Sequence, residues 1–79
     1  MLEELKAIQP GVVLYYRIKK EGIDPRRVWT GRVTSNLTKS EVSLPGFYVE
    51  TLDEGIEGNR EWVGVEQIVS YSTHGLRLV

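Results

Sequence analysis

The sequence predicts an all-β fold in which five short strands form one small, strongly bent barrel. The segment from Arg27 to Thr34 alternates side chains with period two and is rich in β-branched and aromatic residues, as is typical of a strand. Similar segments recur between turns rich in glycine and proline. The chain has 79 residues, so it forms one domain that needs nearly all its large apolar side chains for a core.

The first ten residues are expected to form a short helical or irregular lid over an open end of the barrel. Leu2, Leu5 and Ile8 recur every three residues, which indicates one or two turns of helix. This helix must end by Gln9, because the residue before a proline is driven out of the α-helical region.

Residues 11–72 are expected to form the barrel. A loop at 21–26 joins the first strand, within residues 12–20, to the second strand at 27–36. Gly31 in the second strand indicates a bend or the close approach of another segment. The more apolar face of the first strand is assigned to the core and consists of Val12, Leu14, Tyr16 and Ile18.

The later strands follow from alternating segments between turn residues. A type II turn is expected at Leu44-Pro45-Gly46, with brief pairing of residues 41–44 before it. The third and fourth main strands are expected at 47–52 and 60–64, joined by a glycine-rich hairpin loop. A 3₁₀ turn at 65–68 precedes the fifth strand at 69–72. The tail, residues 73–79, is expected to add a strand or to contact another chain.

The composition argues against catalysis, cofactors, metal and membrane insertion. The chain has no cysteine and one histidine, His74, so it lacks both a zinc-binding set and a catalytic triad. Its start, Met1 to Lys6, is acidic and contains no apolar signal segment. The longest apolar run near the N-terminus, Val12 to Tyr16, is too short to cross a bilayer. We therefore expect a non-catalytic cytoplasmic protein.

The net charge of −1 hides two segments of opposite charge. Residues 10–40 contain seven basic and two acidic side chains, a net charge of +5. Residues 41–68 contain one basic and seven acidic side chains, a net charge of −6. Such a bipolar chain suits electrostatic docking or self-association better than wholesale binding to a polyanion.

Five short strands, a long first loop, a tight glycine hairpin and one helical turn before the last strand resemble the SH3-like small barrels. Within that group the sequence is most similar to the Tudor and chromo-like branch. The resemblance covers residues 11–71 and depends on Trp29-Thr30-Gly31-Arg32-Val33, Gly58-Asn59-Arg60-Glu61-Trp62-Val63 and Glu66-Gln67-Ile68. It implies a barrel fold and a binding function.

The sequence departs from the ligand sites of these families. Tudor domains that bind methylated side chains use an aromatic cage, in which ring faces attract the cation. Trp29 and Tyr16 are candidates for two walls, but the opposing positions hold Leu52 and Ile56. The tyrosine, tryptophan and proline motifs of the SH3 polyproline groove also have no full counterpart. Methyl-lysine and polyproline recognition are therefore disfavoured.

The candidate binding site is a basic face with interleaved aromatic rings on the first two strands and their loop. It is expected to bind a protein partner through electrostatic pairing around an aromatic centre. The alternatives are single-stranded nucleic acid on the same face, a homo-oligomer, or an ordinary solvated face that binds nothing. Trp29 and Trp62 are better explained as core residues than as ligand contacts, because so small a domain needs their buried area. The site residues are Tyr15, Tyr16, Arg17, Lys19, Lys20, Arg26, Arg27, Trp29 and Arg32.

Overall fold

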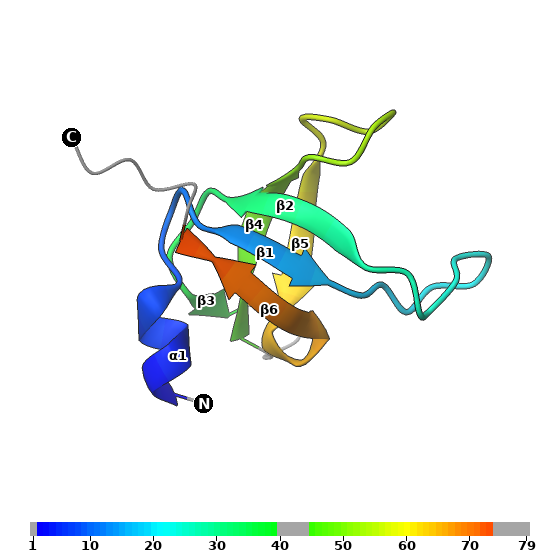
Figure 1. Cartoon of the computed structure of the whole chain (residues 1–79). Helices are drawn as coiled ribbons and strands as arrows, with labels where there is room; N and C mark the ends of the chain where they lie inside the picture. Colours follow the sequence, from blue (N-terminus) through cyan, green and yellow to red (C-terminus); the bar gives the residue numbers. More distant parts are fainter. Residues whose placement is uncertain (1, 40–44, 74–79) are drawn as a thin grey trace.

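The computed structural model describes residues 2–39 and 45–73, and these form one antiparallel sheet with little helix (Figure 1). The expected all-β class is therefore confirmed. Residues 41–44, expected to pair, and most of the tail, residues 74–79, lie outside the described residues. In chain order the elements are α1 (Leu2–Ala7), β1 (Val13–Tyr16), β2 (Trp29–Val33), β3 (Thr38–Lys39), β4 (Pro45–Thr51), β5 (Arg60–Gly64), η1 (Val65–Gln67) and β6 (Ile68–Ser72).

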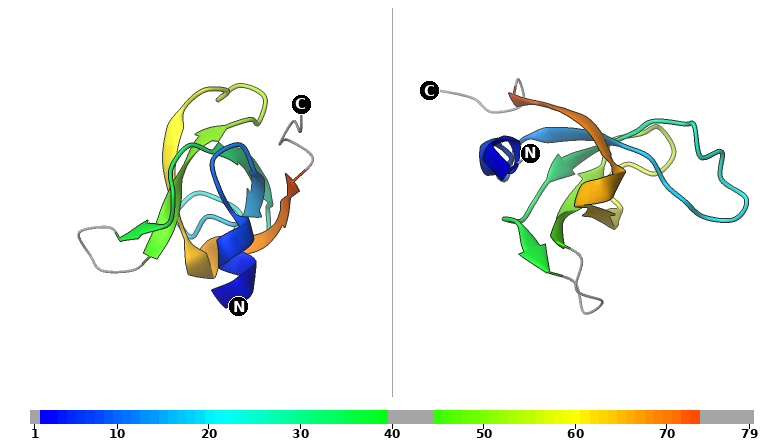
Figure 2. Two further views of the ribbon diagram at one scale, coloured as in Figure 1. Left: turned by 90° about the vertical axis from the view of Figure 1, so that its left-hand side faces the viewer. Right: turned by 90° about the horizontal axis from the view of Figure 1, so that it is seen from below.

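The strands pair in the order β6-β1-β2-β4-β5, and β3 continues along the edge of β4 that β2 occupies. The sheet curves strongly, so its two ends approach one another (Figure 2). The pairing does not close, because no ladder joins β5 to β6 among the described residues. Closure into a barrel therefore stays a prediction.

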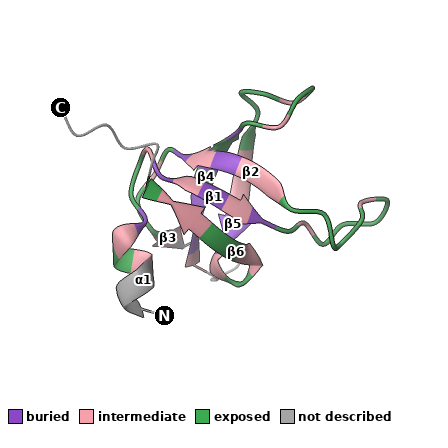
Figure 3. Cartoon of the chain, in the orientation of Figure 1, coloured by how far each residue is buried: buried purple, intermediate pink, exposed green. Residues whose placement is uncertain are grey.

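The core is formed by the side chains that the alternating pattern assigned to it. Val12, Leu14 and Tyr16 are at most 1 % exposed, and Ile18 packs against the same cluster. Val33, Val49 and Val63 face them from the other strands, together with Phe47. Buried residues follow the middle of the strands, and exposed residues follow the loops (Figure 3).

Gly31 is required by a close approach, as the sequence suggested. A Cβ atom at this position would lie 2.7 Å from Val49 Cγ2 and 3.2 Å from Tyr16 Cε1. These distances are shorter than ordinary contacts, so only glycine fits without repacking of β4 or β1.

The helix α1 ends before Pro10, as expected. Ile8, which follows it, is buried, and Leu5 packs against the core. The apolar side of this segment therefore covers part of the core. No helix in the described ranges is long and apolar enough to span a membrane.

The expectation of a turn at Leu44-Pro45-Gly46 is wrong for the two described residues. Pro45 begins β4 opposite Lys39, and Gly46 pairs with both Thr38 and Gly64. Proline is tolerated at the first residue of a strand, where no ladder donor is needed. Strand pairing on both sides of β4 therefore outweighs the preference of Pro45-Gly46 for a turn.

The first two strands are shorter than predicted. The chain leaves β1 after Tyr16, where the Arg17 amide donates to the Gln67 carbonyl at 3.0 Å instead of extending a ladder. Before β2, the Arg27 amide donates to the Asp24 carbonyl and closes a turn. Local turns thus limit both strands.

Candidate functional site

The structure does not gather the three predicted aromatic residues on one surface. Tyr16 lies opposite Trp29 across β1 and β2, whereas Tyr15 lies opposite Thr30 and Ser70. Successive strand residues point to opposite faces of the sheet, so Tyr15 and Tyr16 cannot share a face. Tyr16 is a core residue at 1 % exposure, and Trp29 and Tyr15 are half-buried.

The ring of Trp29 is already covered by a cation of its own chain. The Arg27 guanidinium carbon lies 3.6 Å from the Trp29 ring centroid, which is a close cation–π contact. Because Arg27 occupies this face of the Trp29 ring, the face is not available as the wall of a cage for an external cation. Arg27 and Trp29 therefore act together as a packed pair at the start of β2.

Four of the nine predicted residues line a groove of about 770 Å³ at one end of the sheet. One wall is the chain that leaves β1, with the exposed side chains of Arg17, Lys19 and Lys20. The other wall comes from β5 and η1, with Glu61, Trp62 and Glu66. The lining also includes the fourth predicted residue, the buried Tyr16, together with Ile18 and Val69. We call this the charged groove, and define it by Arg17, Lys19, Lys20, Glu61, Trp62 and Glu66.

Gln67 joins the two walls of the charged groove. The Gln67 side-chain nitrogen donates to the Arg17 carbonyl at 2.9 Å, and the Gln67 carbonyl accepts from the Arg17 amide at 3.0 Å. The Gln67 side-chain oxygen accepts from the Gly64 amide at 2.8 Å. These bonds connect the end of β1 with the turn η1, so Gln67 sets the separation of the basic and acidic walls.

The loop between β1 and β2 is held in shape by two turns and projects from the sheet (Figure 1). The Ile23 amide donates to the Lys20 carbonyl at 3.1 Å. The Asp24 carboxylate accepts from the Arg26 amide at 2.9 Å and lies 3.6 Å from the Arg26 side chain. Arg26 and Arg27 therefore belong to the loop and the Trp29 contact, and they do not line the charged groove.

Arg32 lies away from the groove on the outer face of the sheet. It is opposite Val13 on one side and Glu50 on the other, and its guanidinium donates to the Gly11 carbonyl at 3.3 Å. Glu50 in turn is opposite Arg60. Cross-strand neighbours of opposite charge balance one another on this face, as expected of a solvated sheet surface.

Two buried polar atoms have no hydrogen-bond partner among the described residues: the Tyr16 hydroxyl and the Trp29 indole nitrogen. Burial, and then the charges of Asp53 and Glu61, raise the pKa of Tyr16 to about 12. The hydroxyl is therefore neutral at physiological pH.

The acidic wall was missed by the sequence analysis. Glu61 and Glu66 were assigned to an acidic segment and to the SH3-like pattern, and Trp62 to that pattern and to the core, but none of the three to a binding site. The available signal was the 3₁₀ turn predicted at 65–68, because such a turn brings the end of one strand beside the start of another. The sequence did not indicate which loop faces it.

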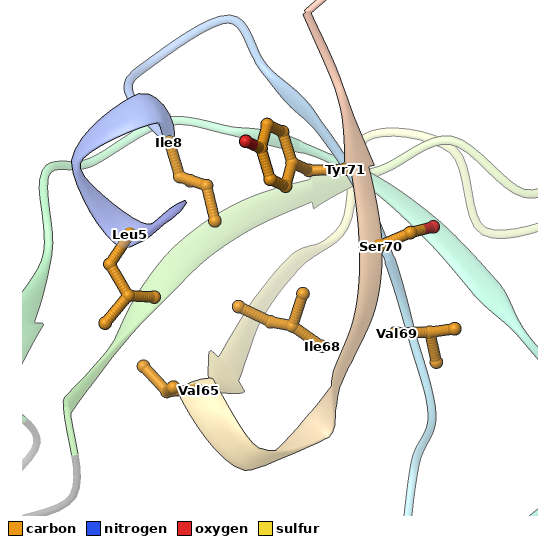
Figure 4. A pocket seen from close by; sticks show the side chains of 7 residues that line it. All are labelled: Leu5, Ile8, Val65, Ile68, Val69, Ser70 and Tyr71. Carbon is orange, nitrogen blue, oxygen red and sulfur yellow. The ribbon is translucent and has the colours of Figure 1, made fainter. Parts of the chain in front are cut away.

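A second cavity of about 420 Å³ lies between α1, η1 and β6 (Figure 4). Leu5 and Ile8 face it from the N-terminal segment, and Val65, Ile68 and Tyr71 from the opposite side. The side chains that line it within the described part of the chain are uncharged. We call it the apolar groove, and define it by these five residues.

The described residues contain no cluster of three or more side chains suited to hold a metal ion. Comparisons of the chain with models of protein families, with curated proteins and with solved structures found no match.

Proposed function

We propose that the chain is a non-catalytic protein-docking module whose charged groove binds an extended segment of a partner protein. The observation that carries this proposal is the composition of the groove: basic side chains from the end of β1 and acidic side chains from β5 and η1 line the same cavity as aromatic and apolar side chains. Concave sites of this kind take an apolar anchor on the floor and orient it by charges at the rim.

The basic wall favours acidic side chains in the partner. Arg17, Lys19 and Lys20 are exposed, and no ion pair within the described ranges involves them. An extended segment with one large apolar residue and flanking acidic residues would seat the apolar residue near Trp62 and Val69. Its acidic side chains would then lie along the basic wall, which favours fast and oriented association.

The acidic wall argues against the nucleic-acid alternative. A phosphate backbone tracks along a continuous positive groove. Here Glu61 and Glu66 line the same groove as the lysines, so a polyanion would meet repulsion on one side. Arg26 and Arg32, two further members of the predicted basic face, are directed to other contacts.

An SH3-like barrel is the fold that we propose for this module. Supporting features are the strand order β6-β1-β2-β4-β5, the long loop after β1 and the 3₁₀ turn between β5 and β6. In this arrangement the loop and the turn border one open end of the sheet, where the charged groove lies.

The test is selection of peptides from a random library displayed on phage, with the full-length protein as bait. We expect enriched sequences to combine acidic residues with a large apolar residue. Enrichment of basic or proline-rich sequences, or no enrichment, would contradict the proposal. Binding of labelled oligothymidine equal to that of the selected peptides would instead support the nucleic-acid alternative.

Matched charge reversals locate the binding site. Lys19→Glu changes the basic wall, and Lys6→Glu makes the same change of charge at an exposed position of α1 that lines neither groove. For a selected peptide, Lys19→Glu should weaken binding about fivefold, and Lys6→Glu should leave it unchanged. Equal effects of the two variants would refute the assignment to the charged groove.

A further inference from the structure

The strand β5 has a strand neighbour on only one side among the described residues. It pairs with β4, and no described strand pairs with its other edge. An unpaired edge presents main-chain N–H and C=O groups that can bond to another extended segment. Glu61 and Trp62 of this strand line the charged groove, so the unpaired edge of β5 borders the groove.

The hydrogen bonds of β4 determine which main-chain groups of β5 lie on that edge. The Tyr48 amide donates to the Ser35 hydroxyl at 3.0 Å, and the Tyr48 carbonyl accepts from the Thr34 amide at 2.9 Å. The Thr51 amide instead donates to the Asn59 carbonyl at 2.8 Å, on the side of β5. Because main-chain groups of successive strand residues point to opposite edges, the ladder between β4 and β5 omits Tyr48.

The main-chain groups of Trp62 therefore point away from β4. Trp62 lies opposite Tyr48, and Arg60 and Gly64 are two residues away on either side, in the same phase of the ladder. The Gly64 amide agrees with this assignment, since it donates to the Gln67 side-chain oxygen at 2.8 Å instead of to β4. Within the described ranges, the corresponding groups of Arg60 and Trp62 have no such partner.

The charged groove separates this edge from the chain that leaves β1. Gln67 bridges the two sides at one end, through its bonds to the Gly64 amide and the Arg17 carbonyl. Beyond this bridge, the exposed Lys19 and Lys20 line the groove together with Trp62. A segment in the groove would therefore have hydrogen-bonding groups on one side and positive charge on the other.

We propose that an acidic segment of the partner protein binds in the charged groove as an added β-strand, bonded to the unpaired edge of β5. Main-chain bonds to Arg60 and Trp62 supply affinity for any extended segment, and the charges of Arg17, Lys19 and Lys20 select an acidic one. This inference rests on the proposed function, because it states how the partner segment is held in the same groove.

Amide hydrogen exchange measured by NMR tests the protein side of this arrangement. In the free protein, the Arg60 and Trp62 amides should exchange faster than the Glu61 and Val63 amides, which face β4. The probe is the peptide most enriched from the random library, synthesised with capped ends. At saturation it should slow exchange at Trp62 about tenfold more than at Glu61 and Val63, which serve as internal controls.

N-methylation of the same peptide tests the partner side. An added strand bonds to its neighbour through every second residue, so methyl groups on alternate amides should each weaken binding about tenfold. Methyl groups on the amides between them are the matched control, and should change binding less than about twofold. Isothermal titration calorimetry measures both series.

The outcomes separate this inference from the proposed function. A peptide that binds without slowing exchange at Trp62, or whose methylated forms show no alternation, would overturn the added strand and leave the docking function standing. The absence of any enriched peptide would reject both. A dimer of the protein alone in light scattering, with exchange at Trp62 already slow, would assign the edge to a second copy and also overturn the inference.

Discussion

Tyr16 illustrates how a single residue can serve the core and border a binding site. Its ring lies beside Gly31, and the residue is among those that line the charged groove, while its hydroxyl lies buried without a partner in the described part of the chain. A buried polar group that makes no hydrogen bond costs about 1–3 kcal/mol. The ring therefore stabilises the fold, and the hydroxyl opposes it.

Removal of this hydroxyl should stabilise the protein. We expect Tyr16→Phe to raise the free energy of unfolding by about 1 kcal/mol, because the ring is kept and the unpaired group is lost. Urea denaturation measures the change. Tyr15→Phe is the matched control, since Tyr15 is half-buried on the outer face, and it should change stability by less than about 0.5 kcal/mol. A loss of stability in Tyr16→Phe would show that the hydroxyl has a partner.

The raised pKa of Tyr16 predicts that the protein loses folding stability at alkaline pH. The pKa of Tyr16 is raised from 10.0 to about 12 in the folded protein, mainly by burial. The folded chain thus holds the hydroxyl proton of Tyr16 more tightly than the unfolded chain does. The contribution of this proton to the free energy of unfolding is therefore complete below pH 10 and is lost as the pH rises through about 12.

Tyr16→Phe has no such proton to lose. Its stability relative to the parent protein should therefore increase between pH 10 and pH 12, the interval between the two pKa values. Urea denaturation of both proteins at several alkaline pH values measures this difference. A difference that is constant with pH would contradict the raised pKa.

At the scale of elements, the charged groove depends on the connection between η1 and the end of β1. Gln67 makes this connection through one side-chain bond to the Arg17 carbonyl and another to the Gly64 amide. The Gly64 amide is only three residues away in the sequence, whereas the Arg17 carbonyl is brought close by the fold, because Arg17 and Gln67 are 50 residues apart. Gln67 is therefore a positioning residue for the two walls.

Gln67→Met keeps the length of the side chain and removes both bonds. We expect a loss of about 1–2 kcal/mol in unfolding free energy and weaker binding of selected peptides. Hydrogen exchange at the Gly64 amide should become faster, which separates the local effect from global unfolding. Unchanged exchange at Gly64 would show that Gln67 does not hold this turn. Glu66→Gln, its exposed neighbour, is the control for stability.

The alternating pattern predicted the elements well where one face is buried. β5 begins and ends at the predicted residues, and the 3₁₀ turn and β6 follow within one residue of their expected positions. The error at Pro45-Gly46 has a physical cause, since pairing on both sides of β4 outweighs a local turn preference. Closure of the barrel stays a prediction, and residues 40–44 lie outside the described residues.

The candidate site was predicted only in part. One cause of the error was visible in the sequence itself. Tyr16 was assigned to the core face with Val12 and Leu14, yet it was also counted as a surface residue beside Tyr15. Period-two alternation does not allow both. The acidic wall could not be predicted, because it depends on contacts between η1 and the end of β1 that are distant in sequence.

At the scale of the whole molecule, the separation of charge along the chain is not a separation in space. The antiparallel order of β2, β4 and β5 places Arg32, Glu50 and Arg60 side by side on the outer face. The charged groove likewise combines lysines from the basic segment with Glu61 and Glu66 from the acidic one. A molecule of this kind presents local patterns of charge, which suit a specific protein segment better than a uniform polyanion.

The central claim, that the charged groove is the docking site, is tested most directly by NMR chemical shifts during titration with a selected acidic peptide. We predict that the amides of Arg17, Lys19 and Glu66 and the indole N–H of Trp62 shift together. Resonances of Thr30 and Arg32 on the outer face should stay in place. Shifts confined to that outer face, or to the residues of the apolar groove, would contradict the account.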